Sequence, residues 1–123
     1  MNKTIMVVDD EEHMFEYLKT GLEISGYNIL GTTNPFKAIE IAHQDKPDLI
    51  MLDFEMPGID GLSVCRGLKL SQITKDIPVL FITGSSKSDI SDQIAKVKAQ
   101  GYISKPFDFN ILKKTIENIL SSK

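Results

Sequence analysis

Acidic, hydroxyl and amine side chains stand where four short apolar segments of this chain end. Asp9 and Asp10 follow the first of these segments, Asp53 closes a run of four apolar residues, and Thr83 and Lys105 end two later segments. Carboxylates can bind a hard divalent cation and can act as nucleophiles toward phosphoryl groups. An ammonium group can neutralise phosphoryl charge. We therefore expect metal-assisted phosphoryl chemistry, provided that the fold brings these residues together.

The three carboxylates would repel one another at a shared site. A like-charged pair about 4 Å apart costs roughly 4 kcal/mol at an effective dielectric constant near 20. Raised pKa values or a bound cation must compensate for this repulsion. Oxygen ligands favour Mg²⁺, which needs only one or two carboxylates. The expected cofactor is therefore Mg²⁺.

Each of these residues also has a purely structural explanation. The segment Asp9–Glu12 is an acidic run of the kind that a helix dipole favours at a helix start. Asp53 would then be a turn or cap residue, Thr83 an ordinary strand residue and Lys105 a surface cation. We favour the functional interpretation because the acids, the hydroxyl and the amine are expected at one edge of a sheet.

Short apolar segments alternate with amphipathic ones, which predicts strands alternating with helices. The run Leu49–Asp53 is typical of a strand buried on both faces of a parallel sheet. The expected strands are Thr4–Val8, Asn28–Thr32, Leu49–Asp53, Pro78–Thr83 and an edge strand at Gly101–Ser104. The expected helices are Glu12–Ser25 with Gly26 after its end, Pro35–His43, Leu62–Leu70, a segment through Lys98 with Ile90, Ile94 and Val97 inward, and Phe109–Leu120.

Five strand–helix repeats with short loops predict one α/β domain over residues 1–123, with a parallel sheet covered on both faces. The candidate architecture is the flavodoxin-like (βα)5 doubly wound fold with strand order 2-1-3-4-5. In that order the first and third strands are neighbours at the topological switch point. Asp9 and Asp10 would then lie across a crevice from Asp53.

Composition limits the remaining classes. The 123 residues carry a formal charge of −3, which disfavours direct nucleic-acid binding by a basic face. The single cysteine, Cys65, cannot form an internal disulfide, which suits a reducing cytosol and predicts a cytoplasmic protein. The first apolar run is too short for a signal peptide or a membrane span.

Five motifs, in order, resemble the receiver domain of two-component response regulators, in particular stand-alone receivers of the chemotaxis type. The resemblance covers essentially the whole chain. The motifs are Val7-Val8-Asp9-Asp10, Pro47-Asp48-Leu49-Ile50-Met51-Leu52-Asp53, Met56-Pro57-Gly58-Ile59-Asp60-Gly61, Ile82-Thr83-Gly84 and Tyr102-Ile103-Ser104-Lys105-Pro106-Phe107. Any one of them is weak, whereas their shared order and spacing are specific.

The resemblance implies a phosphorylation switch with Asp53 as acceptor. The donor would be a phosphohistidine on a sensor histidine kinase or a histidine phosphotransfer protein. Asp10, Asp53 and the backbone carbonyl of Glu55 would hold Mg²⁺, with Asp9 helping through water. Lys105 would contact the phosphoryl group.

The resemblance also implies how the signal would leave the site. Thr83 would move toward the phosphoryl group, and Tyr102 would rotate inward. The Lys105-Pro106 peptide bond is expected to be cis. A population shift of the fourth helix, fifth strand and fifth helix would then control a downstream protein partner. Weaker candidates for partner contact are Lys87, Ser91, Ala95, Ser104 and Asp108.

Three positions depart from common receiver patterns. Glu55 and Ser85 stand two residues after Asp53 and Thr83, where side chains influence phosphoryl lifetime in the family. Lys98-Ala99 replaces a common Gly-Ala pair, so the fourth helix is expected to end differently and more loosely.

Other functions remain as alternatives. An aspartate-nucleophile phosphatase would carry a second aspartate where Glu55 stands, and it would need an inserted cap. A flavin carrier of the same fold would need a phosphate-binding loop where the acids Asp9 and Asp10 stand. A docking scaffold would have no use for crowded carboxylates. We expect a signalling module rather than an enzyme; since no DNA-binding segment follows, its output would come through protein contacts.

Overall fold

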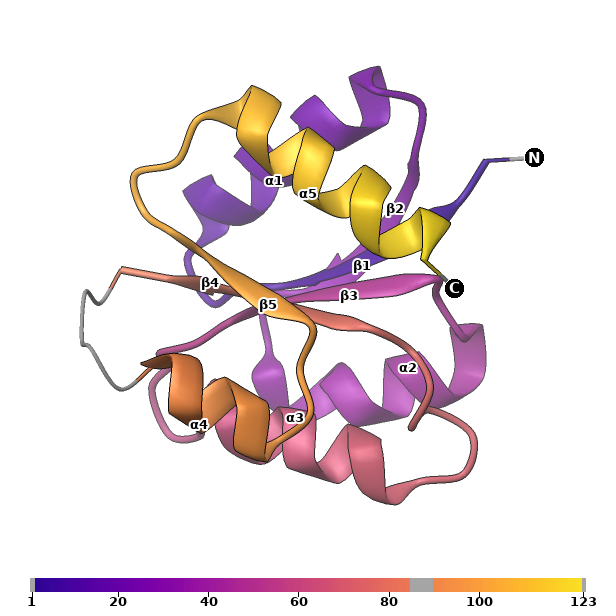
Figure 1. Ribbon diagram of the computed structural model, residues 1–123, viewed down its shortest axis with the longest axis vertical. Helices are drawn as coiled ribbons and strands as arrows, with labels where there is room; N and C mark the ends of the chain where they lie inside the picture. The colour runs from indigo at the N-terminus through magenta and orange to yellow at the C-terminus, as the bar shows by residue number, and fades with distance from the viewer. Residues whose placement is uncertain (1, 85–89, 123) are drawn as a thin grey trace.

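The computed structural model describes residues 2–84 and 90–122, and they form three layers (Figure 1). A central sheet is covered by α1 and α5 on one face and by α2, α3 and α4 on the other. The strands are β1 (Thr4–Val8), β2 (Asn28–Thr32), β3 (Leu49–Asp53), β4 (Val79–Thr83) and β5 (Gly101–Ser104). The helices are α1 (Glu12–Ile24), α2 (Ala38–Asp45) after the 3-10 turn η1 (Pro35–Lys37), α3 (Gly61–Leu70), α4 (Ile90–Lys96) and α5 (Phe109–Ser121).

The sheet confirms the predicted topology. All strand pairs are parallel, and the order is β2-β1-β3-β4-β5, with β5 at the edge as expected. Pairing of β1 with β3 sets Val8 opposite Leu52, so Asp9 and Asp53 follow at neighbouring positions. The register therefore delivers both acids to one end of the sheet.

Residues that alternate along each strand pack into two separate hydrophobic cores, one on each face of the sheet. In β3, Ile50 and Leu52 face α2, α3 and α4, whereas Leu49 and Met51 face α1 and α5. Every residue of β3 and β4 is buried, which confirms the prediction of strands covered on both faces. Burial of these apolar residues, at about 25 cal/mol per Å², fixes the strand ends that carry the polar groups.

Several helix ends differ from the sequence prediction by one to three residues. The segment beginning at Pro35 first forms the turn η1, because the Asn34 side chain accepts a hydrogen bond from the Phe36 N–H. Helix α2 therefore begins only at Ala38. Helix α3 begins at Gly61, one residue early, because the Asp60 side chain accepts a hydrogen bond from the Ser63 N–H.

Helix α4 ends at Lys96 rather than continuing through Lys98. Lys98 has a φ of 62°, the left-handed conformation that glycine usually supplies after a helix. Lys98 thus takes the place of the missing glycine, and the N–H groups of Lys98 and Ala99 donate to the carbonyls of Ala95 and Ile94. The expectation of a looser helix end was therefore wrong. Within the described residues, no helix has both the length and the apolar character needed to cross a bilayer.

Candidate metal and phosphoryl site

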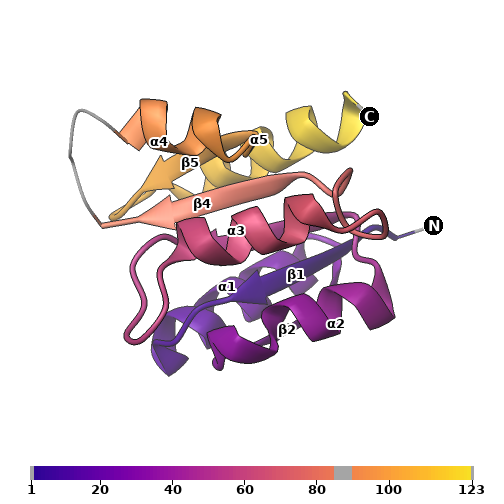
Figure 2. The ribbon, with the colours of Figure 1, turned by 90° about the horizontal axis from the view of Figure 1, so that it is seen from below.

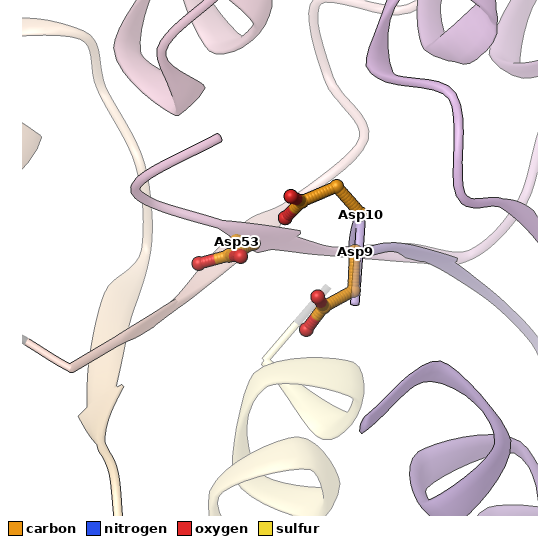
Figure 3. Close-up of side chains that lie close together, drawn as sticks. All are labelled: Asp9, Asp10 and Asp53. Atoms are coloured by element: carbon orange, nitrogen blue, oxygen red, sulfur yellow. The ribbon is translucent and has the colours of Figure 1, made fainter. Parts of the chain in front are cut away.

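Three carboxylates meet at the carboxyl ends of β1 and β3, as the strand order predicted (Figure 3). Asp9, Asp10 and Asp53 each offer one oxygen, and these oxygens lie within 4.8 Å of one another. Asp9 and Asp53 are only 1% and 6% exposed, whereas Asp10 lies more toward solvent. The site is therefore a half-open acidic cluster.

Burial and crowding both resist ionisation of these acids. Loss of water around Asp53 raises its pKa to about 7, and the neighbouring Asp9 carboxylate adds to the rise. The pKa of Asp9 is also raised, again mainly because the group is buried. Lys105 opposes both shifts because its positive charge favours the carboxylate forms.

The Lys105 ammonium lies between the two buried acids. Its Nζ is 3.9 Å from Asp9 Oδ2 and 3.8 Å from Asp53 Oδ1. These distances are too long for hydrogen bonds, so the contact is mainly electrostatic. Lys105 begins the loop that follows β5. Its backbone N–H donates a hydrogen bond to the Thr83 carbonyl oxygen at 2.7 Å, which anchors the start of this loop to β4. The Lys105-Pro106 peptide bond is cis, as expected.

Backbone donors orient one oxygen of each buried acid. The Glu11 N–H donates to Asp9 Oδ1 at 2.9 Å, and the Glu55 N–H donates to Asp53 Oδ1 at 3.3 Å. Asp9 Oδ2 is buried and receives no hydrogen bond. An unsatisfied buried carboxylate oxygen is costly, and a cation beside it would remove the cost. The donor set, all oxygen and anionic, fits a hard divalent ion such as Mg²⁺.

The structure describes three of the other sequence candidates, Thr83, Glu55 and Tyr102. Thr83 is fully buried at the end of β4, next to β5. Glu55 is exposed, and its side chain is outside the three-carboxylate group. Tyr102 lies on β5 with 39% of its surface exposed. Ser85 and Lys87 lie outside the described residues.

Sequence analysis missed the role of Gly61. A Cβ atom there would lie 2.5 Å from the Asp53 carbonyl oxygen and 2.9 Å from Phe81 Cε1. The start of α3 therefore packs directly behind the acidic residue, and only glycine permits this approach. The only available signal was the glycine that follows Asp60 in the turn after β3.

We expect Gly61→Ala to lower the free energy of unfolding by about 1–3 kcal/mol, because the added methyl group must push α3 away from β3. Urea denaturation followed by circular dichroism measures the change. Gly84→Ala is the matched control, since a Cβ atom at Gly84 meets nothing within 4 Å. Equal stability of the two variants would contradict the close packing described for Gly61.

The crowded acids should make the metal-free protein less stable as the pH rises. The folded-state pKa of Asp53, about 7, exceeds its unfolded value of 3.8. Between these values the folded state binds more protons, so the free energy of unfolding falls as the pH increases. At pH 8 in EDTA, Asp53→Asn should raise that free energy by about 1–3 kcal/mol. Denaturant titrations at pH 5 and pH 8 test this, and a variant stabilised equally at both would contradict it.

Comparisons with known proteins give a consistent match. Residues 5–117 match the response regulator receiver domain family. The chain is 39% identical over 107 residues to the phosphate regulon transcriptional regulatory protein PhoB of Pseudomonas aeruginosa, covering 87% of this chain and 47% of PhoB. It is 32% identical over 120 residues to the polar-differentiation response regulator DivK of Brucella anthropi, covering 98% of each. The chain thus spans about half of PhoB but nearly all of DivK.

A solved structure shares the fold. The receiver domain of a sensor histidine kinase from Pseudomonas aeruginosa superposes with a TM-score of 0.89 at 19% identity, covering 98% of this chain and 99% of that chain. That structure has a magnesium ion coordinated in its active site cleft.

Proposed function

This chain belongs to the response regulator receiver family, whose members are signalling modules rather than conventional enzymes, and on that premise we propose that Asp53 accepts a phosphoryl group. The observation that carries the proposal is the position of the Asp53 carboxylate, held beside two further acids and the Lys105 ammonium. Carboxylates form acyl phosphates, and this arrangement supplies a nucleophile with charge compensation next to it. The expected partner upstream is a histidine kinase or a histidine phosphotransfer protein.

The proposed step is a transfer between two side chains. One Asp53 oxygen attacks the phosphorus of a phosphohistidine, the P–N bond breaks, and its electron pair returns to the imidazole nitrogen. The Glu55 N–H fixes the orientation of the Asp53 carboxylate through its hydrogen bond to Oδ1. Lys105 favours the ionised form of Asp53, and its ammonium is close enough to neutralise the arriving phosphoryl oxygens.

The metal ligands would be Asp10, Asp53 and the backbone carbonyl of Glu55, with Asp9 acting through water. Asp9 Oδ2 supports this assignment because it is buried without a hydrogen bond. Bound Mg²⁺ would supply positive charge to the phosphoryl oxygens. The magnesium ion in the homologous kinase receiver domain agrees with this proposal.

The output would arise on the face formed by α4, β5 and α5. Thr83 ends β4 next to β5. Its hydroxyl would bond a phosphoryl oxygen and draw the neighbouring residues toward the site. Tyr102, partly exposed on β5, would turn inward when Thr83 moves. The resulting population shift would change affinity for a downstream protein. Ser91, Ala95, Ser104 and Asp108 are exposed on this side of the chain and remain candidates for that contact.

Acetyl phosphate with Mg²⁺ tests the function without the cognate kinase. We expect intact-mass spectrometry to show the addition of one phosphoryl group, which hydroxylamine removes because it is an acyl phosphate. EDTA should suppress the reaction. An unchanged mass with several small phosphodonors would overturn the proposal and favour a docking scaffold.

A further inference from the structure

A second charged surface lies at the C-terminal ends of α3 and α4. Helices run antiparallel to the strands in this fold, so these ends lie on the side away from the acidic cluster (Figure 2). Two hollows open there and share Lys69 and Lys98. The larger, of about 380 Å³, is lined by Lys69, Lys75, Asp76, Lys98 and Gln100. The smaller, of about 200 Å³, is lined by Arg66, Lys69, Leu70, Lys96, Val97 and Lys98.

We call the five cations of this surface the basic patch: Arg66, Lys69, Lys75, Lys96 and Lys98. They include the only arginine of a chain with net charge −3. Among the described residues that line the two hollows, Asp76 is the only acid. This surface is therefore positively charged although the protein as a whole carries a net negative charge.

Four of the five cations of the basic patch are available to an external partner. Across residues 2–84 and 90–122, none of its five cations forms an ion pair. Lys69 is half-buried, and its Nζ donates to the carbonyls of Lys75 and Ile77 at 3.2 and 2.9 Å. The other four cations are exposed.

Helix dipoles account for only part of the basic patch. Lys69 and Lys96 lie in the last turns of α3 and α4, where a cation is favourable. Arg66 lies before the last turn of α3, while Lys75 and Lys98 lie in the loops that follow the two helices. Local helix stability therefore does not explain why these three cations gather at the same place.

An exposed apolar side chain distinguishes the possible partners. Leu70 lines the smaller hollow and is 83% exposed beside the cations. An inorganic anion offers nothing apolar to cover it. Nucleic acid is disfavoured because no lining residue is aromatic, so bases have nothing to stack on, and because the net charge is negative. A polypeptide can present carboxylates and an apolar side chain together.

We propose that the basic patch is a docking site for an acidic segment of a partner protein, whose carboxylates contact the cations and whose apolar side chain covers Leu70. Charge complementarity would speed the encounter and set the orientation, and the apolar contact would lengthen the residence time. The basic patch lies at the end of the domain opposite Asp53, and it would act in addition to the face formed by α4, β5 and α5.

Fluorescence anisotropy with a labelled synthetic peptide tests the proposal. The probe is about a dozen residues long, mostly Glu with two central Leu residues. Lys96→Gln/Lys98→Gln should weaken binding about fivefold at low salt, whereas the matched pair Lys113→Gln/Lys114→Gln on α5 should change it by less than about twofold. Leu70→Ser, which alters no charge, should weaken binding about threefold.

Wild-type protein labelled with ¹⁵N gives a readout that needs no variant. Amide shifts caused by the peptide should centre on residues 66–76 and 96–100, and shifts centred elsewhere would overturn the proposal. The proposal would be overturned if the two lysine double variants weakened peptide binding equally, or if Leu70→Ser left the affinity unchanged. Either result would mean that the peptide binds only by unspecific ionic attraction. Tighter binding of tripolyphosphate or of a single-stranded oligonucleotide than of the peptide would also overturn it.

Discussion

Asp53→Asn is expected to abolish phosphoryl incorporation from acetyl phosphate, because an amide is no nucleophile toward phosphorus at neutral pH. The substitution keeps the size of the side chain, and it relieves charge repulsion with Asp9. The variant should therefore fold at least as well as the wild-type protein. Intact-mass spectrometry at saturating donor and Mg²⁺ should show no added phosphoryl group in the variant.

The matched control is Asp45→Asn, which makes the same chemical change at an exposed position at the end of α2. This control should take up one phosphoryl group at the wild-type rate. Undiminished labelling of Asp53→Asn would place the acceptor elsewhere. If Asp10 carried the label instead, hydroxylamine lability would persist and peptide mapping would reveal it. Either result would remove Asp53 from the proposed role.

The sequence predicted the structure best where the local residue pattern and the order of the strands in the sheet point to the same arrangement. The apolar run before Asp53 predicted a doubly buried strand, and β3 has the predicted bounds. The alternation of strands and helices limited the topology to few choices, and the observed order set Asp9 beside Asp53. The acidic cluster was predictable because parallel strands place their carboxyl ends together.

Features that depend on packing distance were not predictable. The contact between Gly61 and the Asp53 carbonyl exists only because α3 starts directly behind β3. The size of the pKa shift of Asp53 depends on how much water the folded site excludes. The left-handed Lys98 is another example, since nothing in a lysine favours that conformation.

The basic patch shows the same limit at the level of surfaces. Arg66 and Lys98 are far apart in the chain, and each looks like an ordinary solvated cation in its own segment. Only the packing of α3 and α4 on one face of the sheet brings them to the same hollow. Net charge alone therefore concealed a local excess of positive charge.

Lys105→Met should slow phosphorylation of Asp53 by about 10- to 100-fold, because it removes the ammonium group that lies beside the nucleophile and the incoming group. It also removes the positive charge that lowers the pKa values of Asp9 and Asp53, so the ionised form of Asp53 is less favoured. Both effects act in the same direction. The chain has no tryptophan, so the time course is best followed by intact mass.

The pH dependence separates the two contributions of Lys105. If the variant is slow only because Asp53 is protonated, raising the pH to about 9 should bring its rate close to the wild-type rate, since more of the carboxylate is then ionised. If Lys105 also neutralises the phosphoryl group, most of the deficit should persist at that pH, and this is the result we expect. Lys114→Met on α5 serves as the control and should react like the wild-type protein. A Lys105→Met rate equal to that of the control at every pH would exclude Lys105 from the transfer.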